Sequence, residues 1–123
     1  MILNKYVEWD VETDVIVVGS GGAALTSAIL AHDQGARVII LEKTNQIGGT
    51  TAFSGGIPWI PMNRYMKELG VEDSYEEAKS YITRLTGGKE PNPALVDVYL
   101  EYGPKMIDYL YEHTPVRFAV PKG

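Results

Sequence analysis

Residues 14–42 read DVIVVGSGGAALTSAILAHDQGARVIILE, and this stretch decides the fold. The β-branched run of residues 14–18 predicts a short strand that is buried on both faces of a parallel sheet. Residues 23–34 predict a helix that ends before Gly35, and residues 37–42 predict a second buried strand. Together they form one βαβ unit, which places the chain in the α/β class with a Rossmann-like architecture.

The turn between the first strand and the helix has the pattern Gly19-x-Gly21-x-x-Ala24. The pattern alone is common, but here it follows a strand and opens a helix, as in dinucleotide-binding sites. Gly19 allows the tight turn, Gly21 lets a pyrophosphate approach the backbone, and Ala24 lets the helix pack closely on the strand. Free amides at the helix start favour a diphosphate. The alternative is an ordinary turn between strand and helix.

An acidic residue ends the second strand. Glu42 follows Gly19 by 23 residues, close to the spacing of the acid that binds ribose in dinucleotide folds. A carboxylate at this place accepts both hydroxyls of an adenosine ribose and repels a 2′-phosphate, so NADP fits poorly. The alternative is a solvated residue at a strand end.

Residues 43–61 (KTNQIGGTTAFSGGIPWIP) have no regular period and are rich in Gly, Thr and Pro, which predicts a functional loop. Its paired glycines allow close approach of a ligand to the backbone, and its small hydroxyls can donate to phosphate or ring heteroatoms. Such a loop suits a cofactor that extends beyond its adenosine site. A flexible linker is the alternative, but linkers seldom carry an aromatic residue such as Trp59.

Residues 62–114 are expected to form a helical segment, beginning with a short helix over residues 62–69. Ser74 and Glu77 form a capping-box pattern, which predicts a helix that runs to about Leu85.

A third helix is expected to begin after Asn92 as N-cap, with Pro93 at its first position and a kink at Gly103-Pro104. A further strand is expected over residues 116–120. The buried stripe of the helix is expected to comprise Leu95, Tyr99, Tyr102, Met106, Tyr109, Leu110 and His113.

The composition of the chain excludes several classes of function. The chain has 123 residues, a net charge of −5 and no cysteine, which indicates one small domain or part of a larger one. The lack of cysteine excludes disulfides, thiolate metal sites and Cys nucleophiles, and no acidic cluster has histidines at metal-ligand spacing. The acidic balance argues against nucleic acid or an anionic membrane as partner. No secretory signal or transmembrane segment is expected, so the expected location is cytoplasmic.

Two stretches resemble a known family. Residues 15–43, with GSGGAA, resemble the amino end of the FAD-dependent fumarate reductase/succinate dehydrogenase flavoprotein superfamily. Residues 48–63 (GGTTAFSGGIPWIPMN) are most similar to the 3-ketosteroid dehydrogenase branch, since classical fumarate reductases usually have Asn-Ser at Thr50-Thr51. The resemblance covers roughly residues 12–118.

The resemblance implies that the chain binds FAD. The glycine turn would hold the pyrophosphate, Glu42 the ribose and Lys43 the adenosine half, while the second loop would follow the diphosphate toward the isoalloxazine. The residues implied in cofactor binding are Gly19, Ser20, Gly21, Gly22, Ala23, Ala24, Glu42, Lys43, Gly48, Gly49, Thr50, Thr51, Ser54, Gly55 and Gly56. Members that attach FAD covalently use a histidine in this loop. Residues 43–63 contain none, so the expected FAD is non-covalent.

The resemblance also implies an oxidoreductase that acts on CH–CH bonds, desaturating a cyclic ketone such as a 3-ketosteroid. The alternatives are an alkene reductase like fumarate reductase and a non-catalytic dinucleotide-binding module. Members are several times longer, and their catalytic tyrosines fall outside the matched residues, so no catalytic residue is assigned. Residues 1–123 are therefore expected to be the N-terminal part of an FAD-binding domain without its substrate domain. The remaining polypeptide or a companion subunit would complete the enzyme.

Overall fold

The computed structural model describes residues 8–89 and 92–120, which contain a two-stranded sheet and five helices. The chain divides into two units, Met1–Ile57 and Pro58–Gly123. Part of the amino-terminal stretch on which the signal-sequence prediction rests, residues 1–7, lies outside the described residues. Within the described ranges, no helix is both long enough and apolar enough to cross a membrane.

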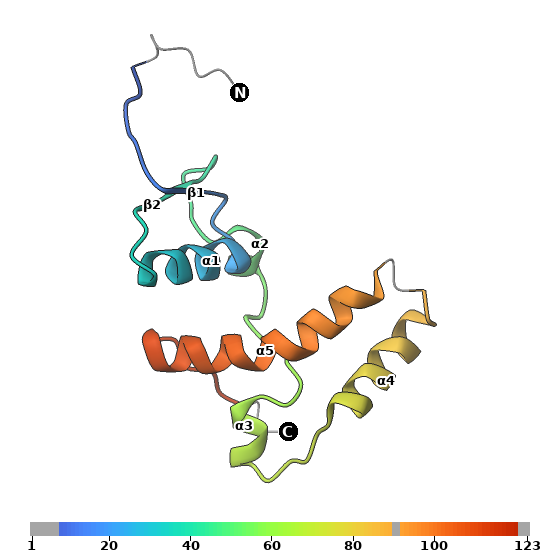
Figure 1. The fold of residues 1–123 in the computed structure, drawn as a ribbon. Helices are drawn as coiled ribbons and strands as arrows, with labels where there is room; N and C mark the ends of the chain where they lie inside the picture. The colour runs from blue at the N-terminus through green and yellow to red at the C-terminus, as the bar shows by residue number, and fades with distance from the viewer. Residues whose placement is uncertain (1–7, 90–91, 121–123) are drawn as a thin grey trace. The chain divides into compact units, whose positions relative to one another are not determined.

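The first unit contains the predicted βαβ arrangement. Strand β1 (Val15–Val18) leads into helix α1 (Gly22–Asp33), which leads into strand β2 (Val38–Leu41) (Figure 1). The strands are parallel, and their register runs from Val15 opposite Val38 to Val18 opposite Leu41. The α/β class is confirmed because both strands and the crossover helix form where the sequence predicts them.

The two faces of this sheet differ. Helix α1 packs on both strands, and its Ala28 is buried. The side chains that point the other way are exposed, with 61% of Ile16 and 81% of Val18 accessible to solvent. The expectation that both strands are buried on both faces is therefore wrong for the part of the chain that the structure describes. The two strands carry more apolar side chains than helix α1 alone can bury.

The second glycine-rich segment contains a short helix rather than only irregular loop. Helix α2 (Gly49–Phe53) begins after Gly48, whose φ of 114° lies in the left-handed region that favours glycine. Ser54 ends the helix, and its hydroxyl donates to the carbonyl of Thr51 at 2.8 Å. The expectation of a loop without regular structure over residues 43–61 is wrong at this point, because the turn at Gly48 starts a helical turn.

The second unit begins with two predicted helices. Asn63 caps helix α3 (Arg64–Glu68), and Ser74 caps helix α4 (Tyr75–Thr86) by accepting a hydrogen bond from the amide of Glu77 at 3.2 Å. In a full capping box, the glutamate side chain also accepts a hydrogen bond from the amide of the cap residue. Here the Ser74 amide donates to Asp73 instead, and the Glu77 carboxylate accepts from the Ser74 hydroxyl.

Helix α5 (Pro93–His113) begins as predicted, because Asn92 accepts a hydrogen bond from the amide of Ala94. It continues through Pro104, and no strand follows it within residues 116–120. Its buried residues are Leu100, Gly103, Ile107 and Leu110.

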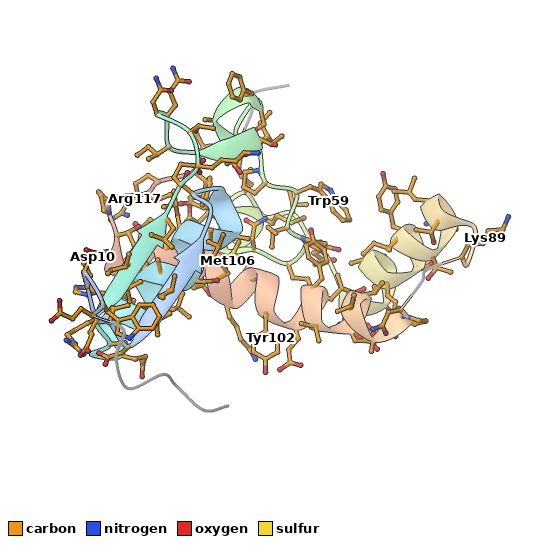
Figure 2. The ribbon with its side chains drawn as sticks, turned by 90° about the horizontal axis from the view of Figure 1, so that it is seen from above. Asp10, Trp59, Lys89, Tyr102, Met106 and Arg117 are labelled. Atoms are coloured by element: carbon orange, nitrogen blue, oxygen red, sulfur yellow. The ribbon has the colours of Figure 1, made fainter. Side chains whose placement is uncertain are left out.

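The predicted buried stripe of α5 is confirmed at Leu110 and wrong at three of its other members, while the remaining three are half-buried. The exposed members are Leu95, Tyr102 and His113. Leu95 and Tyr102 are 63% and 56% exposed, and Figure 2 shows the ring of Tyr102 projecting from the helix. The Gly103-Pro104 pair predicts a kink, whereas in the structure Gly103 lies at the centre of the buried face of α5. A face centred on Gly103 takes in Leu100 and Ile107, three residues before it and four after it, instead of the tyrosines.

The packing around Gly103 predicts that Gly103→Ala lowers the free energy of unfolding. A Cβ at this position would lie 3.1 Å from Cγ2 of Ile60, so Gly103→Ala requires the Ile60 side chain to shift by a few tenths of an ångström. Overpacking costs roughly 1–3 kcal/mol, against a helix-propensity gain of about 1 kcal/mol. We expect a net loss of about 1 kcal/mol in the free energy of unfolding, measured by chemical denaturation. In an Ile60→Ala background, which removes Cγ2, the same substitution should instead stabilise the protein. Destabilisation of equal size in both backgrounds would contradict this packing argument.

Candidate functional site

A cavity of about 480 Å³ lies where both strands of the first unit end. Ligands of parallel α/β sheets bind outside the carboxyl ends of the strands, and ligand pockets typically measure ~300–1,000 Å³. Both the place and the size therefore suit a small-molecule ligand. The lining residues are Val18, Gly19, Ser20, Gly21, Leu41, Glu42, Lys43 and Gly49.

The cavity has bare backbone at the glycine turn. Gly19 has a φ of 93°, and its amide donates to the carbonyl of Leu41 at 2.7 Å, so the turn is tied to the end of β2. A Cβ at Gly19 would have no atom within 4 Å, and one at Gly21 would meet only Thr51 Oγ1 at 3.9 Å. Gly21 is the N-cap of α1 and provides no side-chain cap. A ligand can therefore approach the backbone at the start of α1, as the glycine pattern predicts.

Glu42 contributes an ionised carboxylate to this cavity. Its Oε2 accepts from the Ser20 hydroxyl at 2.5 Å, and its Oε1 accepts from the Thr44 amide at 3.0 Å. These hydrogen bonds, with that of Ser20 first, lower the pKa of Glu42 from 4.5 to about 2. The carboxylate is therefore negatively charged at neutral pH and its orientation is fixed from two sides.

The carboxylate keeps capacity for a ligand. The Thr44 hydroxyl lies 3.1 Å from Oε1 of Glu42 and 2.7 Å from the carbonyl of Gln46, and the Lys43 amide also contributes to the lowered pKa of Glu42. A carboxylate has roughly four acceptor positions on its two oxygens, and Oε2 accepts from the Ser20 hydroxyl. Two vicinal hydroxyls, such as those of a ribose, can donate to these two oxygens, so this site fits a nucleoside sugar.

The second glycine-rich segment contacts the first. The Gly48 amide donates to the Ser20 hydroxyl at 2.9 Å, and Thr51 Oγ1 accepts from the Gly22 amide at 3.0 Å. A Cβ on Gly49 would lie 3.4 Å from Cα of Gly21, so the two backbones approach closely. Residues about thirty positions apart in the sequence thus meet at one place. The expectation that all the first amides of α1 are free is wrong for Gly22, because Thr51 already accepts its hydrogen bond.

The remaining predicted residues lie at different distances from the cavity. The first turn of α1 contains Ala23, which is exposed, and Ala24, which is half-buried. The Ser54 hydroxyl accepts from the Gly56 amide at 3.1 Å, within its own loop. Several predicted residues are absent from the cavity lining, namely Gly22, Ala23, Ala24, Gly48, Thr50, Thr51, Ser54, Gly55 and Gly56.

Sequence reasoning missed the role of Thr44. This residue follows the strand-end acid by two positions, and small hydroxyl residues in such turns often bond to nearby groups of the chain. That tendency is the signal that could have identified it. The buried position of the Ser20 side chain, which is 1% exposed, had no comparable signal.

Trp59 packs in the second unit. Its ring stacks on that of Tyr99 with an interplanar angle of 16°, and its carbonyl accepts a hydrogen bond from the Tyr99 hydroxyl. It also contacts the ring of Tyr81 at a centroid distance of 5.4 Å. A flexible linker around Trp59 is therefore excluded, because the residue is part of an aromatic cluster. No group of acidic and histidine side chains within the described ranges could hold a metal ion.

Comparison with known proteins extends these observations. A family profile described as "FAD binding domain" matches residues 14–123. The 3-oxosteroid 1-dehydrogenase of Mycobacterium tuberculosis (strain H37Rv) is 41% identical over 108 residues, which are 88% of this chain and 19% of that protein. The NADH:fumarate oxidoreductase of Klebsiella pneumoniae is 42% identical over 98 residues, which are 79% of this chain and 10% of that protein.

A solved structure agrees. The crystal structure of 3-ketosteroid Δ1-dehydrogenase from Sterolibacterium denitrificans, in complex with 1,4-androstadiene-3,17-dione, is 43% identical with a TM-score of 0.71. The match covers 80% of this chain and 17% of that one. The chain thus spans about a fifth of the length of the dehydrogenases that it matches.

Proposed function

The chain belongs to the FAD-binding domain family, and from this premise we propose that the cavity at the ends of β1 and β2 holds the adenosine diphosphate half of FAD. The bare backbone at Gly19 and Gly21 would face the diphosphate, and Glu42 would accept the ribose hydroxyls. Lys43 lines the same cavity and would lie by the adenosine. The observation that carries this proposal is the ionised Glu42 carboxylate in the lining of the cavity, beside a backbone without side chains at Gly19 and Gly21.

The proposal extends to the remaining residues of the two glycine-rich segments. Gly22, Ala23 and Ala24 would contribute the start of α1 to the diphosphate site. The second segment would follow the cofactor toward the isoalloxazine, and the hydrogen bonds of Gly48 and Thr51 to the first turn support this path. The other members of this proposed segment are Gly49, Thr50, Ser54, Gly55 and Gly56. FAD would be bound without a covalent link, since residues 43–63 contain no histidine.

The proposed activity is desaturation of a cyclic ketone, of which a 3-ketosteroid is the first candidate. The support is the similarity to 3-oxosteroid 1-dehydrogenase and to the ketosteroid enzyme of Sterolibacterium denitrificans. When bound, FAD supplies the acceptor for a hydride removed from the substrate. The part of this chain is to bind and orient the cofactor, and we assign no catalytic residue among residues 8–89 and 92–120.

We further propose that more polypeptide covers the exposed face of the sheet and completes a Rossmann-like domain. The exposed Ile16 and Val18 side chains support this, because parallel strands normally have helices on both faces. A cavity of about 570 Å³ over this face is lined partly by Trp9, Ile16 and Leu41, an apolar surface that a second layer could fill. The greater length of the relatives is consistent with such a layer, whether it comes from one polypeptide or from a companion subunit.

A second candidate activity is reduction of an activated alkene. The similarity to the NADH:fumarate oxidoreductase of Klebsiella pneumoniae favours it, since that protein is 42% identical over 98 residues. The same cofactor site serves either direction, so the site geometry does not separate the two.

Purification of the protein that carries residues 1–123 tests the proposal. We expect a yellow protein whose flavin spectrum is released into solution on denaturation, because the cofactor is not covalently bound. Turnover of a 3-ketosteroid with an artificial electron acceptor would support the dehydrogenase, whereas oxidation of a reduced dye by fumarate would support the alkene reductase. Flavin without either activity would favour a non-catalytic binding module. A colourless protein that binds NAD would contradict the FAD assignment.

A further inference from the structure

Ser20 is the one buried polar residue among those that the structure describes, with 1% of its surface exposed. Its hydroxyl lies 2.5 Å from Oε2 of Glu42 and 2.9 Å from the amide nitrogen of Gly48. The three residues belong to three separate segments: the turn after β1, the end of β2 and the start of α2. One side chain therefore joins all the segments that surround the proposed cofactor cavity.

The direction of these hydrogen bonds is fixed. A serine hydroxyl has one hydrogen and two acceptor lone pairs, and an amide can only donate. The hydroxyl therefore accepts from Gly48 and must direct its hydrogen toward the ionised Glu42 carboxylate. A hydrogen bond to a charged acceptor is stronger than one between neutral groups, so this contact orients the carboxylate firmly.

We propose that Ser20 is a positioning residue, which fixes the Glu42 carboxylate for the cofactor ribose and ties it to the Gly48 turn of the second glycine-rich segment. This inference rests on the proposed FAD site. Ser20 itself need not touch the cofactor with its side chain, because its hydroxyl is turned toward Glu42 and Gly48 and is buried. Its effect on FAD would pass through Glu42, whose ionised form it stabilises.

Two substitutions of matched shape isolate the hydroxyl. Ser20→Thr and Ser20→Val introduce side chains of nearly equal volume, so any overlap caused by the added methyl group is common to both. Only threonine keeps a hydroxyl that can bond to Glu42 and Gly48. A Glu42 carboxylate that is no longer held in place would lose a hydrogen bond to the ribose, and loss of one hydrogen bond to a charged group corresponds to about tenfold or more in a binding constant. We expect FAD to bind at least tenfold more weakly to the valine variant than to the threonine variant.

The pH dependence of FAD binding provides a second measurement. Only Glu42 and Lys43 carry charge among the residues that line the cavity, and Glu42 is the one acidic side chain of the two. In wild type and in Ser20→Thr, Glu42 stays ionised well below pH 4.5, because its folded pKa is lowered. In Ser20→Val the pKa returns toward its ordinary value. As the pH falls below about 4.5, FAD affinity should therefore decrease first for the valine variant and only at lower pH for the other two proteins.

The affinity of each variant for FAD is measured by flavin fluorescence, using the intact protein freed of its flavin. Weaker, more pH-sensitive binding by Ser20→Val than by Ser20→Thr supports the inference, and equal binding overturns it. If neither variant folds, Ser20→Ala is compared in wild type and in a Glu42→Gln background. A smaller effect in the second background supports action through Glu42, and equal effects overturn it. If wild type binds no FAD, the proposed function itself fails, which differs from tight wild-type binding that Ser20 does not influence.

Discussion

Arginine in place of Glu42 is expected to remove nearly all FAD from the purified protein. The substitution deletes both oxygens that are proposed to accept the ribose hydroxyls, and it places a cation where the protein has an ionised carboxylate with a pKa of about 2. Hydrogen bonds to charged groups contribute roughly 1.5–3 kcal/mol each, so the loss of two corresponds to at least about a hundredfold in affinity. The ratio of flavin absorbance to protein absorbance after purification measures the result.

Two companion variants make this result specific. Glu8→Arg changes the net charge by the same amount at an exposed residue outside the cavity lining, and it should retain the wild-type flavin content. Glu42→Gln keeps the shape of the side chain but removes its charge, and its loss should be intermediate. Full flavin content in Glu42→Arg would exclude Glu42 from the cofactor site.

We expect Gly21→Ser to weaken FAD binding without lowering the free energy of unfolding. Gly21 has a φ of −70°, which any residue adopts, and a Cβ there would meet only Thr51 Oγ1 at 3.9 Å. Serine is also a better N-cap than glycine, so the free energy of unfolding should stay equal or rise slightly. In the cavity, however, the new side chain would occupy the space through which the diphosphate is proposed to reach the backbone. Its hydroxyl would also accept from amides of the first turn of α1, which are proposed to donate to the diphosphate. We expect FAD affinity to fall roughly tenfold to a hundredfold, in line with overpacking costs of ~1–3 kcal/mol.

Gly21→Ala is the matched variant for this test. It adds the Cβ without the hydroxyl, so it should also weaken FAD binding while being somewhat less stable than Gly21→Ser, because alanine is a poor N-cap. Thermal unfolding of the flavin-free proteins and titration with FAD measure the two quantities separately. Wild-type affinity in both variants would show that no diphosphate lies against Gly21.

The parts of the fold that follow from the sequence are those with strong local signals. The β-branched runs around Val17 and Ile39 and the break at Gly35 are sufficient to predict the βαβ unit. Side-chain caps predict the starts of α4 and α5, because Ser74 and Asn92 provide the acceptor that each helix start requires.

Local signals failed where distant contacts decide the structure. Helix α2 forms over Gly49–Phe53, where Gly49, Thr50 and Thr51 have low helix propensity. The Thr51 hydroxyl there accepts from the amide of Gly22, which lies 29 residues earlier in the chain. The packed face of α5 was mispredicted because Gly103 has no side chain to signal burial, yet Ile60 fills the space beside it.

The candidate site could likewise be predicted from the sequence only in part. The glycine pattern and the strand-end acid locate the cavity, since the residue types themselves carry the chemistry. The hydrogen-bond partners of Glu42 could not be deduced, because Ser20 occupies a variable position of the glycine pattern and its burial depends on three segments meeting. The sequence therefore predicts which acid lines the cavity, and the structure explains how that acid is oriented.

The hydrogen bond between Thr51 and the amide of Gly22 has a practical consequence for work with the flavin-free form. The first amides of a helix have no partner within the helix, and this amide obtains its acceptor from the Thr51 side chain of the same chain. Its hydrogen bond therefore does not depend on a bound anion. Mild removal of the natural flavin should leave a molecule that can be reconstituted with modified flavins of shifted redox potential.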